Sequence, residues 1–257
     1  MKFYKLKCSG ASERGSRREN QDNLRFGDFH AFIDQTRSYA VSRCFSTEKC
    51  QVFCVCDGVG GAENGDMAST GALVAVKQYL AEENQEQLED MVLHAAERAN
   101  SWVQEFYQCG GRVGGSTLAM VAILGEQYVA LNIGDSPIFL YSRRKRALQE
   151  LSVRHTQAWD LRRRGEIPDQ KSEHTLVYYL GKANTDAQKM AHICTGTLAP
   201  GDSLLLCSDG VSEAFSQKKL CRRMRWKVSA KKLTASAAKA PNADNCTAVC
   251  IRTVEEE

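Results

Sequence analysis

The sequence has 257 residues, of which 43% are hydrophobic and 25% charged, enough for one large core or two small ones. The net charge is only +3, with 34 basic against 31 acidic residues, so bulk electrostatics does not indicate nucleic-acid binding. No window approaches the roughly 18 apolar residues of a membrane-spanning helix. The first residues, MKFYKLKCSGASERG, form neither a signal peptide nor an acylation motif, so we expect a soluble, cytoplasmic protein.

Six short apolar runs, each bounded by glycine or polar residues, predict β-strands. In chain order they are Val52–Cys56, Thr117–Leu124, Tyr128–Ile133, Ile138–Ser142, Ser203–Cys207 and Thr247–Ile251. Gly125-Glu126 separates two of these strands by a loop short enough for a hairpin.

Apolar residues at helical spacing predict two long helices, over Met67–Leu80 and Leu88–Phe106, each with one buried stripe. A shorter helix is expected over Thr156–Arg164, ended by Gly165, and short helices or loop over Ser216–Ala240. This order of elements suits an α+β sandwich better than alternating βαβ units. Without a repeat, a linker or a break in composition, residues 1–257 are predicted to form a single domain.

Eleven cysteines are scattered along the chain without any CxxC pair. Several of them, such as Cys54, Cys56, Cys207 and Cys250, lie inside apolar runs. We therefore expect reduced core thiols of a cytosolic protein in preference to a disulfide framework.

Five aspartates share one kind of position, at or near the ends of apolar runs: Asp22, Asp57, Asp135, Asp209 and Asp244. Taken singly, each is better explained as a turn former or a cap. Taken together, carboxylates gathered at strand ends would repel one another and raise each other's pKa unless cations held them, so the set indicates a metal site. Oxygen ligands without a His/Cys pattern favour Mg²⁺ or Mn²⁺ over Zn²⁺.

Such a site can perform phosphoryl chemistry, because two cations about 4 Å apart can share a hydroxide and clamp the oxygens of a phosphoryl group. Arg17, five residues before Asp22, could supply a fork of donors to the phosphate. A solvated surface charge is an equal interpretation for Arg17, since Arg14 and Arg18 lie close by.

The motifs as a set resemble those of the metal-dependent protein phosphatase (protein phosphatase 2C-like) family, most closely its short bacterial-type members, over nearly the whole chain. They are RRENQD, CDGVGG, GGSTLAM, NIGDS, LLLCSDGVSE and ADNCTAV. The resemblance implies an α+β fold in the form of a four-layer αββα sandwich, in which two mostly antiparallel β-sheets are flanked by helices. It places a cluster of two Mn²⁺ or Mg²⁺ ions, with a possible third, at one end between the sheets.

The resemblance also implies roles for individual residues. Asp57 would bridge two metals, with Asp22 and the Gly58 carbonyl on one ion. Asp209 and Asp244 would bind the other ion, and Asp135 with Asp209 would match a weaker third site. Arg17 would bind the substrate phosphate.

The implied function is a serine/threonine protein phosphatase that hydrolyses phosphoserine and phosphothreonine by attack of a metal-bridging hydroxide. Its partners would be phosphorylated protein substrates of a cytosolic kinase, with no nucleic acid and no membrane, and the protein is expected to be a monomer. The alternatives are a non-catalytic phosphoprotein-binding regulator, which should have lost metal ligands, and a hydrolase of small phosphoesters.

Three positions depart from the family pattern. His155 follows Arg154 where many relatives have aspartate, and it is predicted to be a structural, hydrogen-bonding histidine. Val59 stands where some relatives carry a histidine that could protonate the leaving group, and Pro137 stands in place of the usual arginine. None of these changes removes a metal ligand.

Three other segments draw attention. By resemblance, a flap near the site is predicted around Pro168–Leu180. Phe29–Gln51 looks longer than a hairpin requires and has no assigned role. The basic runs Arg143–Arg146 and Lys218–Lys232 are best explained as solvated faces, with docking of acidic phosphoprotein substrates as the alternative.

Overall fold

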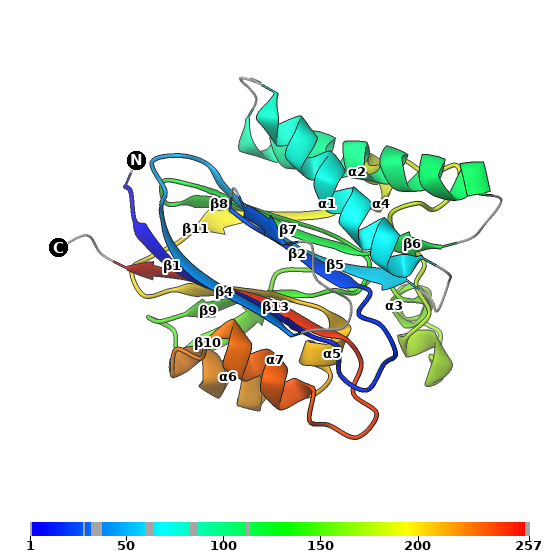
Figure 1. The fold of residues 1–257 in the computed structure, drawn as a ribbon. Coiled ribbons are helices and arrows are strands. Elements are labelled where there is room, and N and C mark those ends of the chain that lie inside the picture. Colours follow the sequence, from blue (N-terminus) through cyan, green and yellow to red (C-terminus); the bar gives the residue numbers. More distant parts are fainter. Residues whose placement is uncertain are drawn as a thin grey trace.

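Two antiparallel β-sheets pack face to face between two layers of helices (Figure 1). The computed structural model of the protein describes residues 2–27, 29–31, 38–59, 64–82, 87–110 and 114–254. One sheet contains, in spatial order, β10 (Ala147–Glu150), β9 (Ile138–Ser142), β12 (Ser203–Cys207), β13 (Cys246–Val254), β1 (Lys5–Glu13) and β4 (Tyr39–Ser46). The other contains β11 (His192–Thr197), β8 (Gln127–Ile133), β7 (Leu118–Leu124), β5 (Gln51–Val59), β2 (Asp22–Phe26) and β3 (Phe29–Ala31), with the short β6 (Gly115–Ser116) paired to β5.

The helices cover the outer faces of the two sheets (Figure 1). The second sheet is covered by α1 (Gly65–Ala81), α2 (Leu88–Gly110) and the short α4 (Ala187–Met190). The first sheet is covered by α6 (Gln217–Arg225) and α7 (Ala230–Ala237). At one end of the sandwich lie α3 (Gln157–Arg163), the 3₁₀ turn η1 (Lys171–Glu173) and α5 (Asp209–Ser212). The predicted αββα sandwich is therefore confirmed.

Strand β5 shows why the central strands are apolar on both faces. Phe53 and Val55 pack between the two sheets, whereas Cys54 and Cys56 pack under α1 and α2. Because successive side chains of a strand point to opposite faces, a strand inside a four-layer sandwich must be apolar at every position. The continuous run that precedes Asp57 follows from this burial.

The predicted central elements are present. The six predicted strands correspond to β5, β7, β8, β9, β12 and β13, and the predicted long helices to α1 and α2. The Gly125-Glu126 hairpin joins β7 to β8, with Leu124 opposite Gln127. The shorter helix is α3, and the Ser216–Ala240 segment forms α6 and α7.

Several outer strands escaped the sequence pattern. β1 has the sequence KLKCSGASE, whose small and polar residues give a weak apolar signal although it lies between β13 and β4. The segment Phe29–Gln51 contributes β3 and the edge strand β4, while residues 32–37 lie outside the described part. In the described ranges, no helix combines the length and the apolarity needed to cross a membrane.

All eleven cysteines are free thiols. Six are buried, as expected for core thiols, but Cys44, Cys50 and Cys109 are exposed. Burial raises the pKa of the Cys54 thiol to about 12, so this side chain stays protonated and inert at neutral pH.

Candidate active site

The alternation of the strands brings two carboxylates together at one end of the sandwich. Asp57 follows Phe53 and Val55 on the face of β5 that looks into the space between the sheets. Asp22 starts β2 and lies directly opposite Asp57 in the antiparallel register. The hydrophobic core between the sheets thus ends at Asp57 on β5 and at Asp22 on β2.

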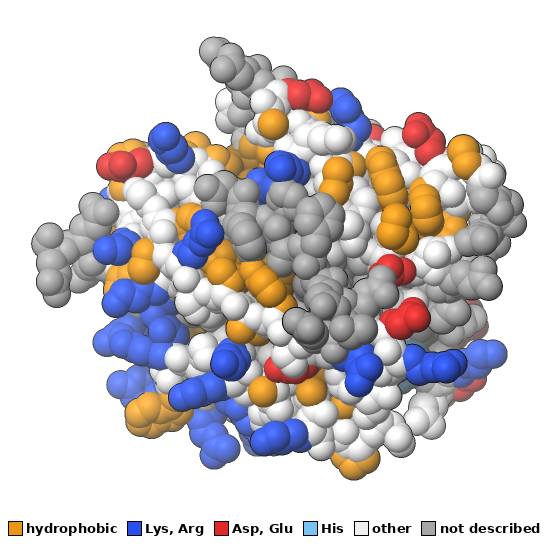
Figure 2. Space-filling view, in the orientation of Figure 1, with side chains coloured by type: hydrophobic (Ala, Val, Ile, Leu, Met, Phe, Trp, Pro, Cys, Tyr) orange, Lys and Arg blue, Asp and Glu red, His pale blue; other side chains and the backbone are white. Residues whose placement is uncertain are grey.

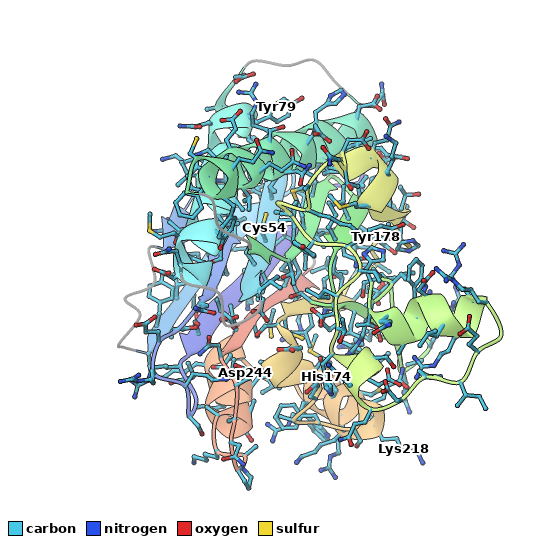
Figure 3. All side chains as sticks on the ribbon, turned by 90° about the vertical axis from the view of Figure 1, so that its right-hand side faces the viewer. Cys54, Tyr79, His174, Tyr178, Lys218 and Asp244 are labelled. Carbon is cyan, nitrogen blue, oxygen red and sulfur yellow. The ribbon has the colours of Figure 1, made fainter. Side chains whose placement is uncertain are left out.

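The other sheet and the loops supply three further carboxylates. Asp209 begins α5 immediately after β12, and Asp244 lies just before β13. Asp135 follows β8 through Gly134, whose φ of 101° suits glycine. Figure 3 looks onto this end of the molecule, with Asp244 and His174 labelled.

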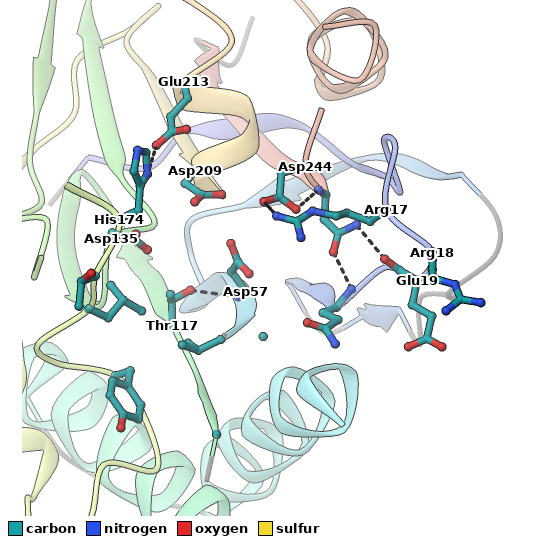
Figure 4. Close-up of a pocket in the computed structure, with 18 residues that line it drawn as sticks. Arg17, Arg18, Glu19, Asp57, Thr117, Asp135, His174, Asp209, Glu213 and Asp244 are labelled. Atoms are coloured by element: carbon teal, nitrogen blue, oxygen red, sulfur yellow. Dashed lines mark hydrogen bonds and ion pairs between the residues drawn. The ribbon is translucent and has the colours of Figure 1, made fainter. Parts of the chain in front are cut away.

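These elements enclose a pocket of about 1300 Å³ (Figure 4). Of the predicted site residues, six line it: Arg17, Asp57, Gly58, Asp135, Asp209 and Asp244. The carboxylates of Asp57, Asp209 and Asp244 point toward one another from three segments (Figure 4). Within the described ranges, however, no three acidic, histidine or cysteine side chains form a group compact enough to hold a metal ion.

Asp22 differs from the other predicted residues because it lies beneath the pocket wall and does not line the pocket. Its Oδ2 accepts a hydrogen bond from the Ser208 hydroxyl at 2.8 Å, whereas its Oδ1 is buried and has no hydrogen-bond partner among the described residues. A buried carboxylate oxygen without a donor is costly unless the group is protonated or meets a cation. The preceding residue, Gln21, lines the pocket.

The electrostatics of the site favour protonation of its acids. Burial, followed by repulsion from neighbouring carboxylates, raises the pKa of Asp57 and of Asp209 well above their usual range. Burial likewise raises the pKa of Asp22 and of Asp135 to about 6, although hydroxyl donors such as Ser208 act in the opposite direction on Asp22. If all of these acids were ionised, the group would carry an excess of negative charge that a cation would relieve.

Arg17 is the cation that contacts the cluster. Its guanidinium lies 2.5 Å from Asp244 Oδ2, and this hydrogen bond is the main cause of its raised pKa. The side chain is 60% exposed, so it can exchange this contact for one with a ligand. Arg17 lines the pocket and pairs with one of its acids, and a role in binding phosphate stays a prediction.

Gly58 has a steric role that the sequence did not reveal. A Cβ at this position would lie 2.3 Å from the carbonyl oxygen of Gly65, at the start of α1. Residue 58 must therefore be glycine for β5 and α1 to approach each other, whatever its carbonyl binds.

Two side chains near the acidic motifs hold the pocket wall together. Asn245 donates hydrogen bonds through Nδ2 to the carbonyls of Arg14 and Glu19 and accepts one from Gln21 N–H, so it secures the loop that carries Arg17. Thr117 accepts through Oγ1 from Asp57 N–H at 3.0 Å. Both residues lie inside motifs that the sequence analysis quoted, but their roles become visible only through these contacts.

The predicted flap segment lies beside the site. His174, Thr175, Leu176 and Tyr179 line the pocket opposite the loop of Arg17. The imidazole Nδ1 of His174 lies 3.2 Å from a carboxylate oxygen of Glu213, which follows α5. Glu213 ends the motif LLLCSDGVSE, but nothing in that motif assigned it a role, and His174 belongs to none of the quoted motifs. Their meeting in the pocket was therefore not predicted.

The prediction of a structural role for His155 is confirmed. This residue is buried, and its Nδ1 accepts a hydrogen bond from Gly134 N–H at 3.2 Å. Its ring packs edge-on against Trp159 and Tyr178, and burial lowers its pKa to about 4. The histidine is therefore neutral at pH 7 and fixes the turn that carries Asp135.

Comparison with known proteins identifies the family. A model of the protein phosphatase 2C family matches residues 27–244. The chain belongs to the protein phosphatase 2C family. Comparison with individual curated protein sequences gives no significant match.

Solved structures of bacterial serine/threonine phosphatases share the fold over their full length. The Mycobacterium tuberculosis phosphatase PstP/Ppp is 21% identical, with a TM-score of 0.76 over 98% of this chain and 100% of its own. The phosphatase MsPP from Mycobacterium smegmatis, solved with cacodylate, is 25% identical, with a TM-score of 0.69 over 95% of this chain and 97% of its own. This protein is thus a member of the protein phosphatase 2C family and has the fold of these bacterial phosphatases.

The family is metal-dependent, and one relative illustrates this directly. The catalytic domain of PstP, solved in complex with two manganese ions, is 23% identical to this phosphatase. Its TM-score is 0.74 over 97% of this chain and 100% of its own.

Proposed function

We propose that this phosphatase removes phosphate from phosphoserine and phosphothreonine in proteins, and that divalent cations in the 1300 Å³ pocket are required. The observation that carries the proposal is that Asp57, Asp135, Asp209 and Asp244 come from four distant segments to one pocket. Among the described residues, Arg17 forms an ion pair with Asp244, and Arg154 acts electrostatically on Asp135.

The donor set fits Mn²⁺ or Mg²⁺, because it consists of carboxylate and carbonyl oxygens. Asp57, the Gly58 carbonyl, Asp209 and Asp244 would hold two such ions. Asp22 would contribute from the buried side of Asp57, where its Oδ1 has no hydrogen-bond partner. Asp135, with Asp209, would form a third and weaker site.

When bound, the cations would offset the repulsion among the carboxylates and activate a water for attack on phosphorus. The protein's own residues would then orient the substrate and the ligands. Arg17 would release Asp244 and bind the phosphate, Thr117 would hold the backbone of Asp57, and Glu213 would fix the imidazole of His174. Retention of all five acids argues against the non-catalytic alternative.

A panel of substrates tests the proposed function. With Mn²⁺, phosphoserine and phosphothreonine peptides should be hydrolysed with kcat/KM at least about tenfold above that of a phosphotyrosine peptide or a nucleotide monophosphate. Excess chelator should abolish the activity, and added Mn²⁺ should restore it. A preference for the nucleotide would indicate a small-molecule hydrolase, and binding of phosphopeptides without turnover would indicate a regulator.

Replacement of Arg17 by alanine is expected to lower kcat/KM for a phosphopeptide by roughly 10- to 100-fold, because a charge-assisted hydrogen bond to the phosphate would be lost. Most of the change should appear in KM, with partial rescue by Arg17→Lys. The melting temperature should change little, because the exposed pair with Asp244 contributes about 1 kcal/mol at most. Arg18→Ala is the matched control, since Arg18 also lines the pocket; equal losses in both variants would refute a specific role for Arg17.

A further inference from the structure

Basic residues are concentrated on one face of the molecule, away from the phosphatase pocket. Thirteen of the 34 Lys and Arg residues lie in residues 143–146 and 214–243, which contain no Asp or Glu. The rest of the chain therefore carries 21 basic against 31 acidic residues, so the net charge of +3 hides a strong asymmetry. In Figure 2 these basic side chains cover the lower left of the molecule, over α6 and the β9–β10 turn.

This face is hollowed into a groove. Three adjoining hollows of about 250, 340 and 180 Å³ share Lys227 and run from the β9–β10 turn across the end of α6 to the α6–α7 turn. We call this the basic groove and define it by Arg143, Arg146, Arg225, Lys227, Arg252 and Trp226. The hollow between the β9–β10 turn and α6 is lined by the five basic residues and by no acidic one.

In the part of the chain that the structure describes, the cations of the basic groove have no acidic side chain as an ion-pair partner. None of the five basic residues forms an ion pair with any described residue. The nearby Asp202 is already used, because its two carboxylate oxygens accept hydrogen bonds from the backbone N–H groups of Arg143 and Ala199. Arg252 is half-buried, and its pKa is lowered by burial and by repulsion from Arg143. Several cations in a concave site without a counter-charge repel one another. Such an arrangement is more typical of an anion-binding site than of an ordinary solvated surface.

Three features narrow down the occupant. Guanidinium groups bind carboxylates and phosphates in a bidentate manner, and Arg outnumbers Lys among the groove's five cations. A membrane surface is disfavoured, because Leu220 and Met224 of α6 are buried in the protein and leave the helix no apolar face for lipid. Single-stranded nucleic acid needs a series of aromatic platforms, whereas Trp226 is the one large aromatic side chain exposed in the described part of the groove.

The basic groove is separate from the phosphatase pocket. β12 and β13 run between the two sites: Asp209 follows one end of β12, while at the other end Ser203 lies opposite Arg252. Strands of five to nine residues place the sites roughly 20 Å apart. A partner bound in the groove would therefore leave the catalytic pocket open.

We propose that the basic groove binds an acidic peptide segment of a partner protein in an extended conformation. The anionic side chains of the segment meet the guanidiniums of Arg143, Arg225 and Arg252, and its backbone passes Trp226. This binding does not require turnover, so it can be tested independently of the catalytic assignment.

Fluorescence anisotropy with a fluorescein-labelled decaglutamate peptide tests the proposal on the full chain. The peptide should bind, with affinity falling as salt rises, and Arg225→Glu combined with Arg252→Glu should raise Kd at least tenfold. The double variant Arg143→Ser, Arg146→Ser in the exposed turn should weaken binding in the same direction, which guards against misfolding of the first variant. Hydrolysis of an aryl phosphate should stay within about twofold of wild type in both, since none of these residues lines the catalytic pocket.

The charge-matched control is Lys49→Glu combined with Lys77→Glu, two exposed positions outside the groove. Equal loss of binding in this control would show nonspecific attraction and overturn the proposal. So would an absence of peptide binding, undiminished binding in the groove variants, or tighter groove-dependent binding of a deoxythymidine decamer or phosphatidylserine vesicles.

Discussion

Replacement of Asp57 by asparagine is expected to lower phosphopeptide hydrolysis by at least about a thousandfold, because the proposed metal bridge would be lost. In the metal-free protein the same substitution should raise the melting temperature, by about 4 °C or more. The reason is that Asp57 is a partly buried carboxylate surrounded by the carboxylates of Asp22, Asp209, Asp135 and Asp244, so its ionisation costs folding free energy. Asparagine keeps the shape and removes the charge.

Two measurements on one pair of proteins check this prediction: initial rates with Mn²⁺ and thermal unfolding in excess chelator. Asp90→Asn is the control, because Asp90 is exposed on α2 and lies outside the pocket. Replacing an aspartate that stabilises the fold through its charge would lower the melting temperature of the protein. A lower melting temperature for Asp57→Asn in chelator would therefore contradict the electrostatic account, and a near-normal rate would contradict the catalytic one.

The metal-free protein is expected to lose stability as the pH rises from about 4.5 to 7.5, by roughly 5 °C in melting temperature. The folded-state pKa of Asp22 and of Asp135 is about 6, against an ordinary value of 3.8, and the pKa values of Asp57 and Asp209 are also raised well above 3.8. In this window the folded protein holds protons that the unfolded chain releases, so deprotonation favours unfolding. The stability that protonated acids provide is therefore present at low pH and is lost as the pH passes through about 6.

His155 changes the stability in the opposite direction. Its folded-state pKa of about 4 lies below the ordinary 6.5, so between these pH values the unfolded chain binds a proton that the folded protein does not. This histidine therefore makes the folded protein more stable as the pH rises. The four acids should change the stability with pH more than this one histidine does. A matched variant separates the contribution of the acids from that of His155. Asp135→Asn should flatten the dependence of melting temperature on pH in chelator while leaving the contribution of His155 unchanged. Mn²⁺ should raise the melting temperature most at pH 7.5. A wild-type protein that becomes steadily more stable from pH 4.5 to 7.5 in chelator would refute this account.

The elements predicted best were those whose burial is complete. A strand such as β5, buried on both faces, must be apolar throughout, and helices such as α1 and α2 must carry one buried stripe, so both leave a clear periodicity. β1 and β4 show little periodicity in the sequence. β1 is built largely of Ser, Gly, Ala and Cys, and one side of β4 is exposed, so both give only a weak apolar signal. Their places in the sheet come from pairing with β13 and with each other over long sequence separations.

The sequence by itself determined the family, the α+β class and the presence of acids at the ends of strands, because these follow from residue types and their order along the chain. Only the tertiary structure decided that Asp22 lies beneath the pocket wall, that Arg17 pairs with Asp244, and that His174 and Glu213 meet at one side of the pocket. It also decided that Arg252, at the end of β13, joins the basic runs of the β9–β10 turn and α6 in one groove. Contacts of this kind depend on strand register and on helix packing between segments far apart in the chain, for which local periodicity carries no information.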